Sequence, residues 1–127
     1  MKRVLISMLT IASLGTSLGV AAAAPASAAP ANHCSLGVLC IASGFNYTGT
    51  GINVWKCGEI RNIGAEWGSD QVRSFQNNQT GHVVATFYNW TGSEWDPIGW
   101  SRAAENVPYA PEAFYSVPGG VDGVKPC

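Results

Sequence analysis

The chain has few charged residues and no cluster of one sign. Charged side chains make up 12% of its 127 positions. Lys2 and Arg3 are adjacent, but the other basic residues stand singly along the chain: Lys56, Arg61, Arg73, Arg102 and Lys125. A surface that binds nucleic acid or an anionic membrane concentrates basic residues. We therefore expect no nucleic-acid partner.

A long apolar run is also missing, except near the N-terminus. Lys2 and Arg3 precede an apolar run from residue 4 to about residue 24, and Ala26-Ser27-Ala28 follows it. This order is typical of a secretory signal, so residues 1–28 are predicted to be removed from a secreted, extracellular protein. A membrane anchor is disfavoured, because Ser, Thr and Gly interrupt the run and Pro25 follows it. After cleavage we expect no membrane contact.

The rest of the chain, residues 29–127, is predicted to form one monomeric domain without a cofactor. Removing 28 of the 127 residues leaves 99, which suffice for a single core. Loss of Lys2 and Arg3 leaves five basic residues against eight acidic ones, a formal charge of −3.

Four cysteines lie in the part predicted to be exported, where thiols are oxidised, so two disulfides are expected. Of the three possible connectivities we favour Cys34 with Cys40 and Cys57 with Cys127. A short N-terminal clip and a tether on the last residue each restrain a segment that is otherwise loose. A bridge between Cys40 and Cys57 is the rival pairing.

Two stretches 43 residues apart repeat one pattern of nine residues. Residues 42–50 read ASGFNYTGT and residues 85–93 read ATFYNWTGS, with Gly44 against Phe87 as the clear mismatch. Self-similarity at a fixed spacing indicates one structural unit used twice, and units of about 40 residues need each other to bury an apolar face. The repeats are placed at about 36–78 and 81–118, with a tail at 119–127.

Apolar and aromatic residues come in short runs separated by Gly, Asn, Ser and Pro. Such runs are typical of strands, which are predicted at 38–42, 52–55, 72–75, 82–88, 95–100 and 114–117. No helical period is sustained for ten residues, and the best short helical candidate is 101–106. Duplicated short strands predict an all-β sandwich of two Greek-key halves. Ser74 and Ser116, on the returning strands, are expected to hold the two hairpins through their hydroxyls.

An aromatic hairpin that ends in Gly, with a Ser on the returning strand, is similar to the βγ-crystallin Greek key. The segment CSLGVLC at 34–40, followed by FNYTG at 45–49 and SFQNN at 74–78, resembles the Streptomyces metalloproteinase inhibitor family. The resemblance covers about residues 34–118 and is better in the first half, because the second repeat lacks its own cysteine pair. It implies a secreted, βγ-crystallin-like protein with two Greek keys that blocks an extracellular, thermolysin-like metalloprotease.

No catalytic motif marks the chain, so we do not expect an enzyme. GxSxG and HExxH are absent, and His33 and His82 are isolated. Glu94 and Asp96 would share one face of a strand, but Pro97 after them suits an edge or loop, where the charges are solvated. The chain also lacks a CxxC pair, which disfavours a zinc site.

A calcium site of the βγ-crystallin type is the second hypothesis that we considered. The crystallin signature of two acid or amide residues, two spacers, Ser or Thr, and Ser falls on residues 69–74. Only Asp70 and Ser74 satisfy it, and Arg73 puts a cation where an oxygen ligand is expected. We therefore favour Asp70 as a turn residue and Ser74 as a hairpin latch over a metal site.

Protease inhibition is the function that the resemblance implies. A rigid β domain can hold one loop in the shape that a protease cleft accepts, which lowers the entropy cost of binding. Two proline-containing loops, 93–98 and 106–111, are candidates for this contact. The residues expected to touch the protease are Trp95, Asp96, Pro97, Val107, Pro108 and Tyr109.

Five tryptophans allow an alternative function, a non-enzymatic module that binds glycans or the cell wall. Trp55, Trp67 and Trp90 are predicted to pack in the core, whereas Trp95 and Trp100 are candidates for stacking on sugar rings. A crystallin-like toxin of the same fold is a further alternative.

Overall fold

Two four-stranded antiparallel sheets make up most of the computed structural model, which describes residues 34–127. The predicted signal at 1–28 and the short segment before Cys34 lie outside the described residues. The prediction of an all-β fold is confirmed. Within residues 34–127, no helix has the length and apolar character needed to cross a membrane.

The first sheet, sheet A, has the strand order β2-β1-β4-β7. Its strands are β2 (Gly51–Val54), β1 (Leu39–Ala42), β4 (Ser74–Asn77) and β7 (Glu105–Val107). The second sheet, sheet B, has the order β3-β8-β5-β6. Its strands are β3 (Arg61–Asn62), β8 (Gly123–Lys125), β5 (Val84–Trp90) and β6 (Trp95–Arg102). The short helical segments are η2 (Phe45–Tyr47), α1 (Ile63–Trp67) and η3 (Glu112–Phe114).

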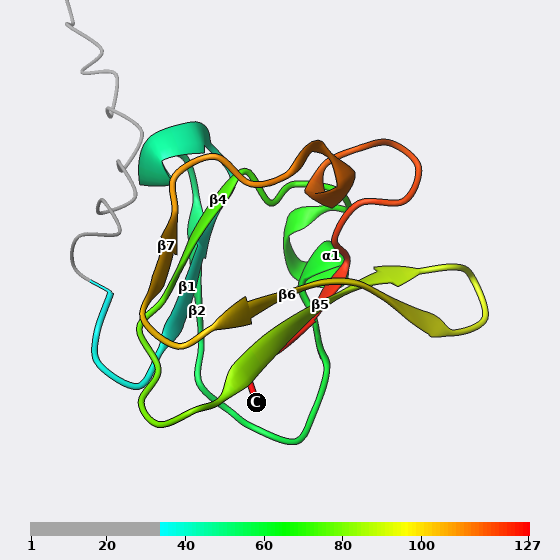
Figure 1. Cartoon of the computed structure of the whole chain (residues 1–127). Coiled ribbons are helices and arrows are strands. Elements are labelled where there is room, and N and C mark those ends of the chain that lie inside the picture. Colours follow the sequence, from blue (N-terminus) through cyan, green and yellow to red (C-terminus); the bar gives the residue numbers. More distant parts are fainter. Residues whose placement is uncertain (1–33) are drawn as a thin grey trace, which may run out of the picture.

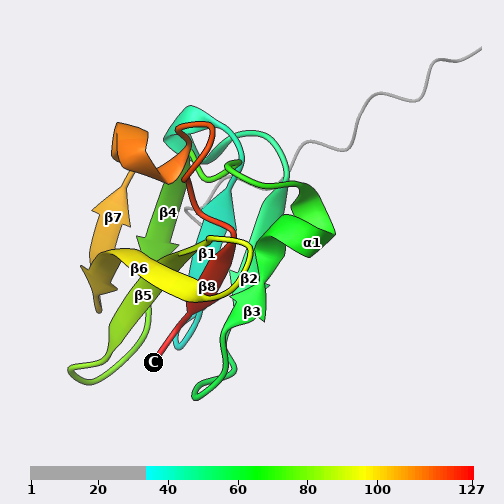
Figure 2. The ribbon, with the colours of Figure 1, turned by 90° about the vertical axis from the view of Figure 1, so that its right-hand side faces the viewer.

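The two halves of the chain exchange their third strands. β3 pairs with β8 of the second half, and β7 pairs with β4 of the first half. The halves correspond strand for strand: β1 to β5, β2 to β6, β3 to β7 and β4 to β8. Exchanging each strand for its counterpart turns the order of sheet A into β6-β5-β8-β3, which is the order of sheet B read from the other edge. Figure 2 shows the strands of sheet B in front of those of sheet A. Neither sheet is complete without both halves.

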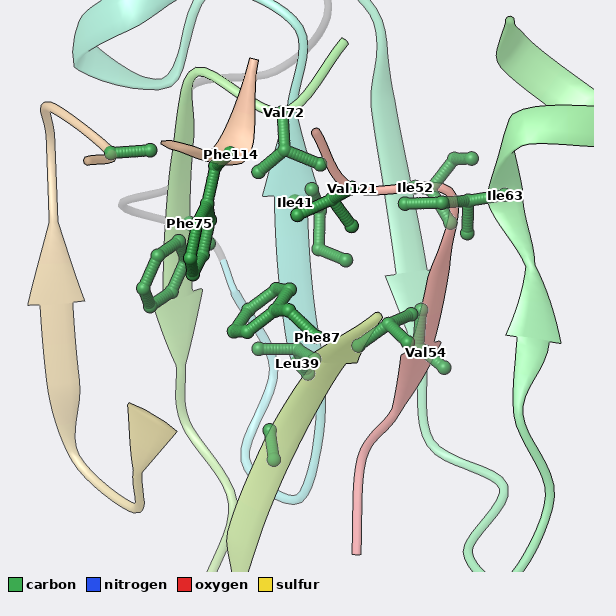
Figure 3. Close-up of a cluster of buried hydrophobic side chains, with 13 residues drawn as sticks. Leu39, Ile41, Ile52, Val54, Ile63, Val72, Phe75, Phe87, Phe114 and Val121 are labelled. Atoms are coloured by element: carbon green, nitrogen blue, oxygen red, sulfur yellow. The ribbon is translucent and has the colours of Figure 1, made fainter. Parts of the chain in front are cut away.

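Three phenylalanines from different elements form the centre of the core. The ring of Phe87 on β5 lies 4.8 Å from that of Phe75 on β4 and 4.7 Å from that of Phe114 on η3, centroid to centroid. Figure 3 shows these rings with the aliphatic side chains of both sheets around them. Gly99 on β6 leaves the space that Phe114 fills, because a Cβ there would collide with the ring. The core thus joins both sheets and η3.

The second half of the fold extends beyond residue 118, where the sequence predicted that it would end. Residues 114–117, expected as a strand, instead end η3 and enter a loop. The returning strand is β8, which lies inside the segment 119–127 that was expected to be a tail. This segment is largely buried, with Val124 fully so, because β8 pairs with both β3 and β5.

The short helical candidate at 101–106 does not form a helix. Residues 101–102 end β6 and 105–107 form β7, with a turn at 103–104 in which Ala104 has φ 66°. The helix that does form, α1, begins after Asn62, whose Oδ1 accepts a hydrogen bond from the Ala65 N–H at 2.8 Å. This N-cap satisfies one of the backbone N–H groups that the first turn of a helix leaves unpaired. With only five residues, α1 is too short to produce a helical period of apolar residues in the sequence.

The single mismatch in the repeat accounts for how the two copies differ. In the first copy β1 ends at Ala42 and the chain folds over itself through η2, so a Cβ on Gly44 would collide with Thr48. In the second copy β5 continues to Trp90, and Phe87, the counterpart of Gly44, places its ring in the core. Figure 1 shows the resulting long β5–β6 hairpin, which extends away from sheet A.

Both predicted disulfides are confirmed. Cys34 is bonded to Cys40, and Cys57 is bonded to Cys127. The first clips the segment before β1. The second joins the loop after β2 in sheet A to the residue that ends the chain after β8 in sheet B, and the Gly58 N–H also donates to the Cys127 carbonyl at 3.1 Å.

Removing the two disulfides separately is expected to cost unequal amounts of stability. They close loops of 6 and 70 residues, for which the chain-entropy relation gives about 2 and about 4 kcal/mol. Paired Cys→Ser variants compared by urea unfolding test this. The Cys57/Cys127 variant should lose more free energy of unfolding than the Cys34/Cys40 variant, and the reverse order would contradict the expectation.

Candidate functional site

A serine latch holds the first hairpin, as predicted. The backbone N–H of Tyr47 donates to Ser74 Oγ at 2.9 Å, and this hydroxyl donates in turn to the Gly44 carbonyl at 2.7 Å. Ser74 is fully buried at the start of β4, next to Ala42 of β1. Both hydrogen bonds fix η2 over sheet A.

An aspartate, not the predicted Ser116, latches the second hairpin. Asp122 Oδ2 accepts from the backbone N–H of Trp90 at 3.0 Å, and Trp90 matches Tyr47 in the repeat. Ser116 instead donates to the carbonyl of Glu112 beside η3. The latch residue precedes β8, so the misplaced returning strand is the cause of this error.

Two buried carboxylates, Asp70 and Asp122, lie close together between α1 and β8. Each is 7% exposed, and neither Oδ1 has a hydrogen-bond partner among the described residues. Burial raises the pKa of Asp70, and the negative charge of Asp122 raises it further, while the N–H of Gly120 and the guanidinium of Arg73 offset only part of this. Asp70 is also held at φ 61°.

Two side chains of the degenerate calcium signature, Ser74 and Arg73, are engaged within the protein. Both hydrogen bonds of the Ser74 hydroxyl are made to the first hairpin. The guanidinium of Arg73 donates to the Asp70 carbonyl at 2.6 Å and lies over the ring of Tyr115. Across residues 34–127, no group of three or more His, Cys, Asp or Glu side chains is arranged to hold a metal ion.

The predicted contact loop at 106–111 begins within β7 and is tied to the rest of the protein on both sides of the exposed Tyr109. The Pro108 carbonyl accepts from the Asn46 N–H at 2.8 Å, and the Ala110 N–H donates to the Arg73 carbonyl at 2.7 Å. Between them, Tyr109 is 62% exposed, and its hydroxyl accepts from Asn46 Nδ2 at 2.8 Å. Its ring lies 5.6 Å from that of Phe45. Val107 ends β7 and packs against the core.

The other predicted contact loop, 93–98, is largely not a loop. Trp95, Asp96 and Pro97 lie in β6, where they pair with Trp90, Asn89 and Tyr88. Only 91–94 form the turn. Proline is tolerated here because β6 is an edge strand of sheet B. The sequence indicated an edge strand or a loop at Pro97, and the structure has the edge strand, within the run predicted at 95–100.

The tryptophans are more exposed than predicted. Trp55 and Trp90, which were expected in the core, are exposed, and the ring of Trp90 packs at a tilt against that of Trp95, with centroids 5.0 Å apart. Trp67 is partly buried and packs against the core. Trp100, a predicted stacking residue, is 61% exposed on β6. Strand position did not reveal these exposures, because alternate residues of a strand face opposite sides.

Comparison with known proteins adds no relative. No family model matches the chain, and neither the curated proteins nor the solved structures contain a significant match.

Replacing Asp70 with Asn is expected to raise the melting temperature at pH 7 by a few degrees. The folded-state pKa of Asp70 is raised, so its ionised form lowers stability at neutral pH. In the wild type this loss is recovered as the pH falls through the raised pKa towards the ordinary value of 3.8. Asparagine tolerates the positive φ and cannot ionise, so the gain should shrink on acidification.

Thermal unfolding of both proteins between pH 7 and pH 3 measures this difference. Asp96→Asn, on the exposed part of β6, is the matched control and should leave the melting temperature unchanged. A lower melting temperature for Asp70→Asn at pH 7, or a gain that does not vary with pH, would contradict the assignment.

Proposed function

We propose that this protein is a secreted inhibitor of an extracellular protease, built from two βγ-crystallin-like Greek keys and without catalytic residues of its own. The observation that carries the proposal is the braced loop at 106–111. The preference for a thermolysin-like metalloprotease rests on the sequence resemblance described above.

The strand order supports the crystallin-like part of the proposal. Each half contributes three strands to one sheet and its third strand to the other. Each half also begins with an aromatic hairpin that ends in a glycine with positive φ, Gly49 or Gly92. A side chain within or just before the fourth strand of that half, Ser74 or Asp122, accepts a hydrogen bond from the hairpin. Two equivalent halves that share their sheets are what a duplicated Greek key requires.

The loop around Tyr109 supports the inhibitory part. Pro108 and Pro111 restrict the backbone on either side of Tyr109, and three hydrogen bonds tie this segment to η2 and to Arg73. Figure 1 shows the segment after β7 passing beside η2 at one end of the sandwich. A loop ordered before binding loses little conformational entropy in a protease cleft.

The Tyr109 backbone is the part of this loop that can meet a protease. Within residues 34–127, its carbonyl accepts no hydrogen bond, whereas the carbonyl of Pro108 is occupied. The side chain of Ala110 is buried, so the ring of Tyr109 is the group that remains for a binding pocket. A free carbonyl beside an exposed aromatic ring can approach a cleft as a substrate does, while the hydrogen bonds on both sides hold the loop in place.

The inhibition is tested with a thermolysin-type zinc protease and a molar excess of the protein. Proteolysis of a peptide substrate should fall, and Tyr109→Ala should weaken the inhibition by about tenfold or more, since an exposed Tyr anchor is the kind of residue that dominates an interface. Val117→Ala is the control, because Val117 is exposed on a different loop.

If an excess of the protein leaves metallo-, serine, cysteine and aspartic proteases fully active, the proposal is wrong. Equal inhibition by the wild type and by a correctly folded Tyr109→Ala variant would remove the assignment of the loop.

A further inference from the structure

The outward faces of the two sheets differ in chemistry although the sheets correspond in strand order. One row across sheet A consists of Asn53, Cys40, Gln76 and Asn106, from β2, β1, β4 and β7. One row across sheet B consists of Trp100, Thr86 and Lys125, from β6, β5 and β8. Amides face outward from one sheet, and an aromatic ring, a hydroxyl and a cation face outward from the other.

Burial of the neighbouring residues fixes the orientation of the row in sheet B. Ala85 and Phe87, on either side of Thr86, are buried in the core, as are Val124 and Pro126 beside Lys125. Alternate residues of a strand face opposite sides, so Thr86 and Lys125 face solvent together with Trp100. Two inter-strand spacings separate Trp100 from Lys125, about 10 Å.

Positive charge gathers around Trp100. The guanidinium of Arg102 lies 5.2 Å from the centroid of its ring. Among residues 34–127 the ion pairs involve Lys56 and Arg61, so neither Arg102 nor Lys125 is paired.

Among the described residues, no acidic side chain forms an ion pair with Arg102 or Lys125. Glu105 accepts a hydrogen bond from the backbone N–H of Arg102, not from its guanidinium. Asp96 pairs with Asn89 further along β6, towards the hairpin turn that contains Glu94. The formal charge of the described chain is negative, yet this patch is cationic.

We infer that the outward face of sheet B, defined by Thr86, Trp100, Arg102 and Lys125, binds an acidic polysaccharide made of uronic acid units. The apolar face of a pyranose ring stacks on the exposed indole of Trp100. The hydroxyl of Thr86 can donate to or accept from the sugar hydroxyls, and the two cations attract the uronate carboxylates. The row across sheet A, by contrast, contains no aromatic ring and no charged side chain.

This site is separate from the loop around Tyr109. Further aromatic residues extend the face along the hairpin. Tyr88 lies two residues beyond Thr86 on the same side of β5. Gly123 pairs with Tyr88, and the ring of Trp95 covers this glycine. A polysaccharide chain can therefore contact the hairpin at more than one unit. Binding here would hold the protein on an acidic matrix while the loop stays free.

Calorimetric titration with hexagalacturonate tests the inference, with a neutral glucan hexamer and hexaglutamate as comparison ligands. Hexagalacturonate should bind, and raising the salt concentration should weaken it, because the cations are exposed. Trp100→Ala should lower the affinity by about tenfold, the equivalent of one stacked aromatic contact. Lys125→Gln should lower the affinity several-fold and reduce the salt dependence.

Two variants away from this face serve as controls. Trp55→Ala removes an equally exposed indole, and Lys56→Gln removes an exposed cation, and both should bind within about twofold of the wild type. Absence of binding, binding that survives Trp100→Ala, or equal binding of hexaglutamate or of the neutral hexamer would each overturn the inference. Unchanged melting temperatures show that the variants are folded.

Discussion

The exchange of third strands between the two halves is the constraint on which the rest of the structure depends. β3 has its ladder partner in β8, and β7 has its partner in β4. Opening one half therefore removes three strands from one sheet and one strand from the other. The Phe75, Phe87 and Phe114 cluster adds the apolar contact that joins the same parts, and the bridge from Cys57 to Cys127 adds a covalent one.

The proposed functions use this rigidity in different ways. The loop around Tyr109 follows the exchanged strand β7 and is tied to the first hairpin, so its shape depends on contacts between the halves. The face proposed to bind a polysaccharide needs three adjacent strands of sheet B in register. Both are surfaces for binding, and both consist of side chains whose backbone positions are fixed by the sandwich.

Local patterns in the sequence revealed much of this architecture. Strand-like runs, the repeat and the cysteine spacing predicted a duplicated all-β domain with the two disulfides that form. The hairpin latch at Ser74 was also predictable, because a hydroxyl beside a tight turn has few other roles. The returning strand of the second half was not, since residues 123–125 are few and the Gly- and Pro-containing segment before them reads as a tail.

The candidate site was less predictable, because exposure depends on which face of a strand a residue occupies. Trp55 and Trp90 are large apolar residues of the kind found in cores, but Trp55, just after β2, and Trp90, at the end of β5, are both exposed. Pro97 allowed either an edge strand or a loop, and only the strand order shows that it lies in an edge strand. The charge of Asp122 raises the pKa of Asp70, although the two positions are 52 residues apart and no motif connects them.

Native-state hydrogen exchange of the whole protein tests most directly whether the two halves form one cooperative unit. If they do, the core amides of β1, β4, β5 and β8 should exchange through a single opening whose free energy equals that of global unfolding. Exchange of β5 and β8 through a separate opening of lower free energy, while β1 and β4 stay protected, would contradict the account.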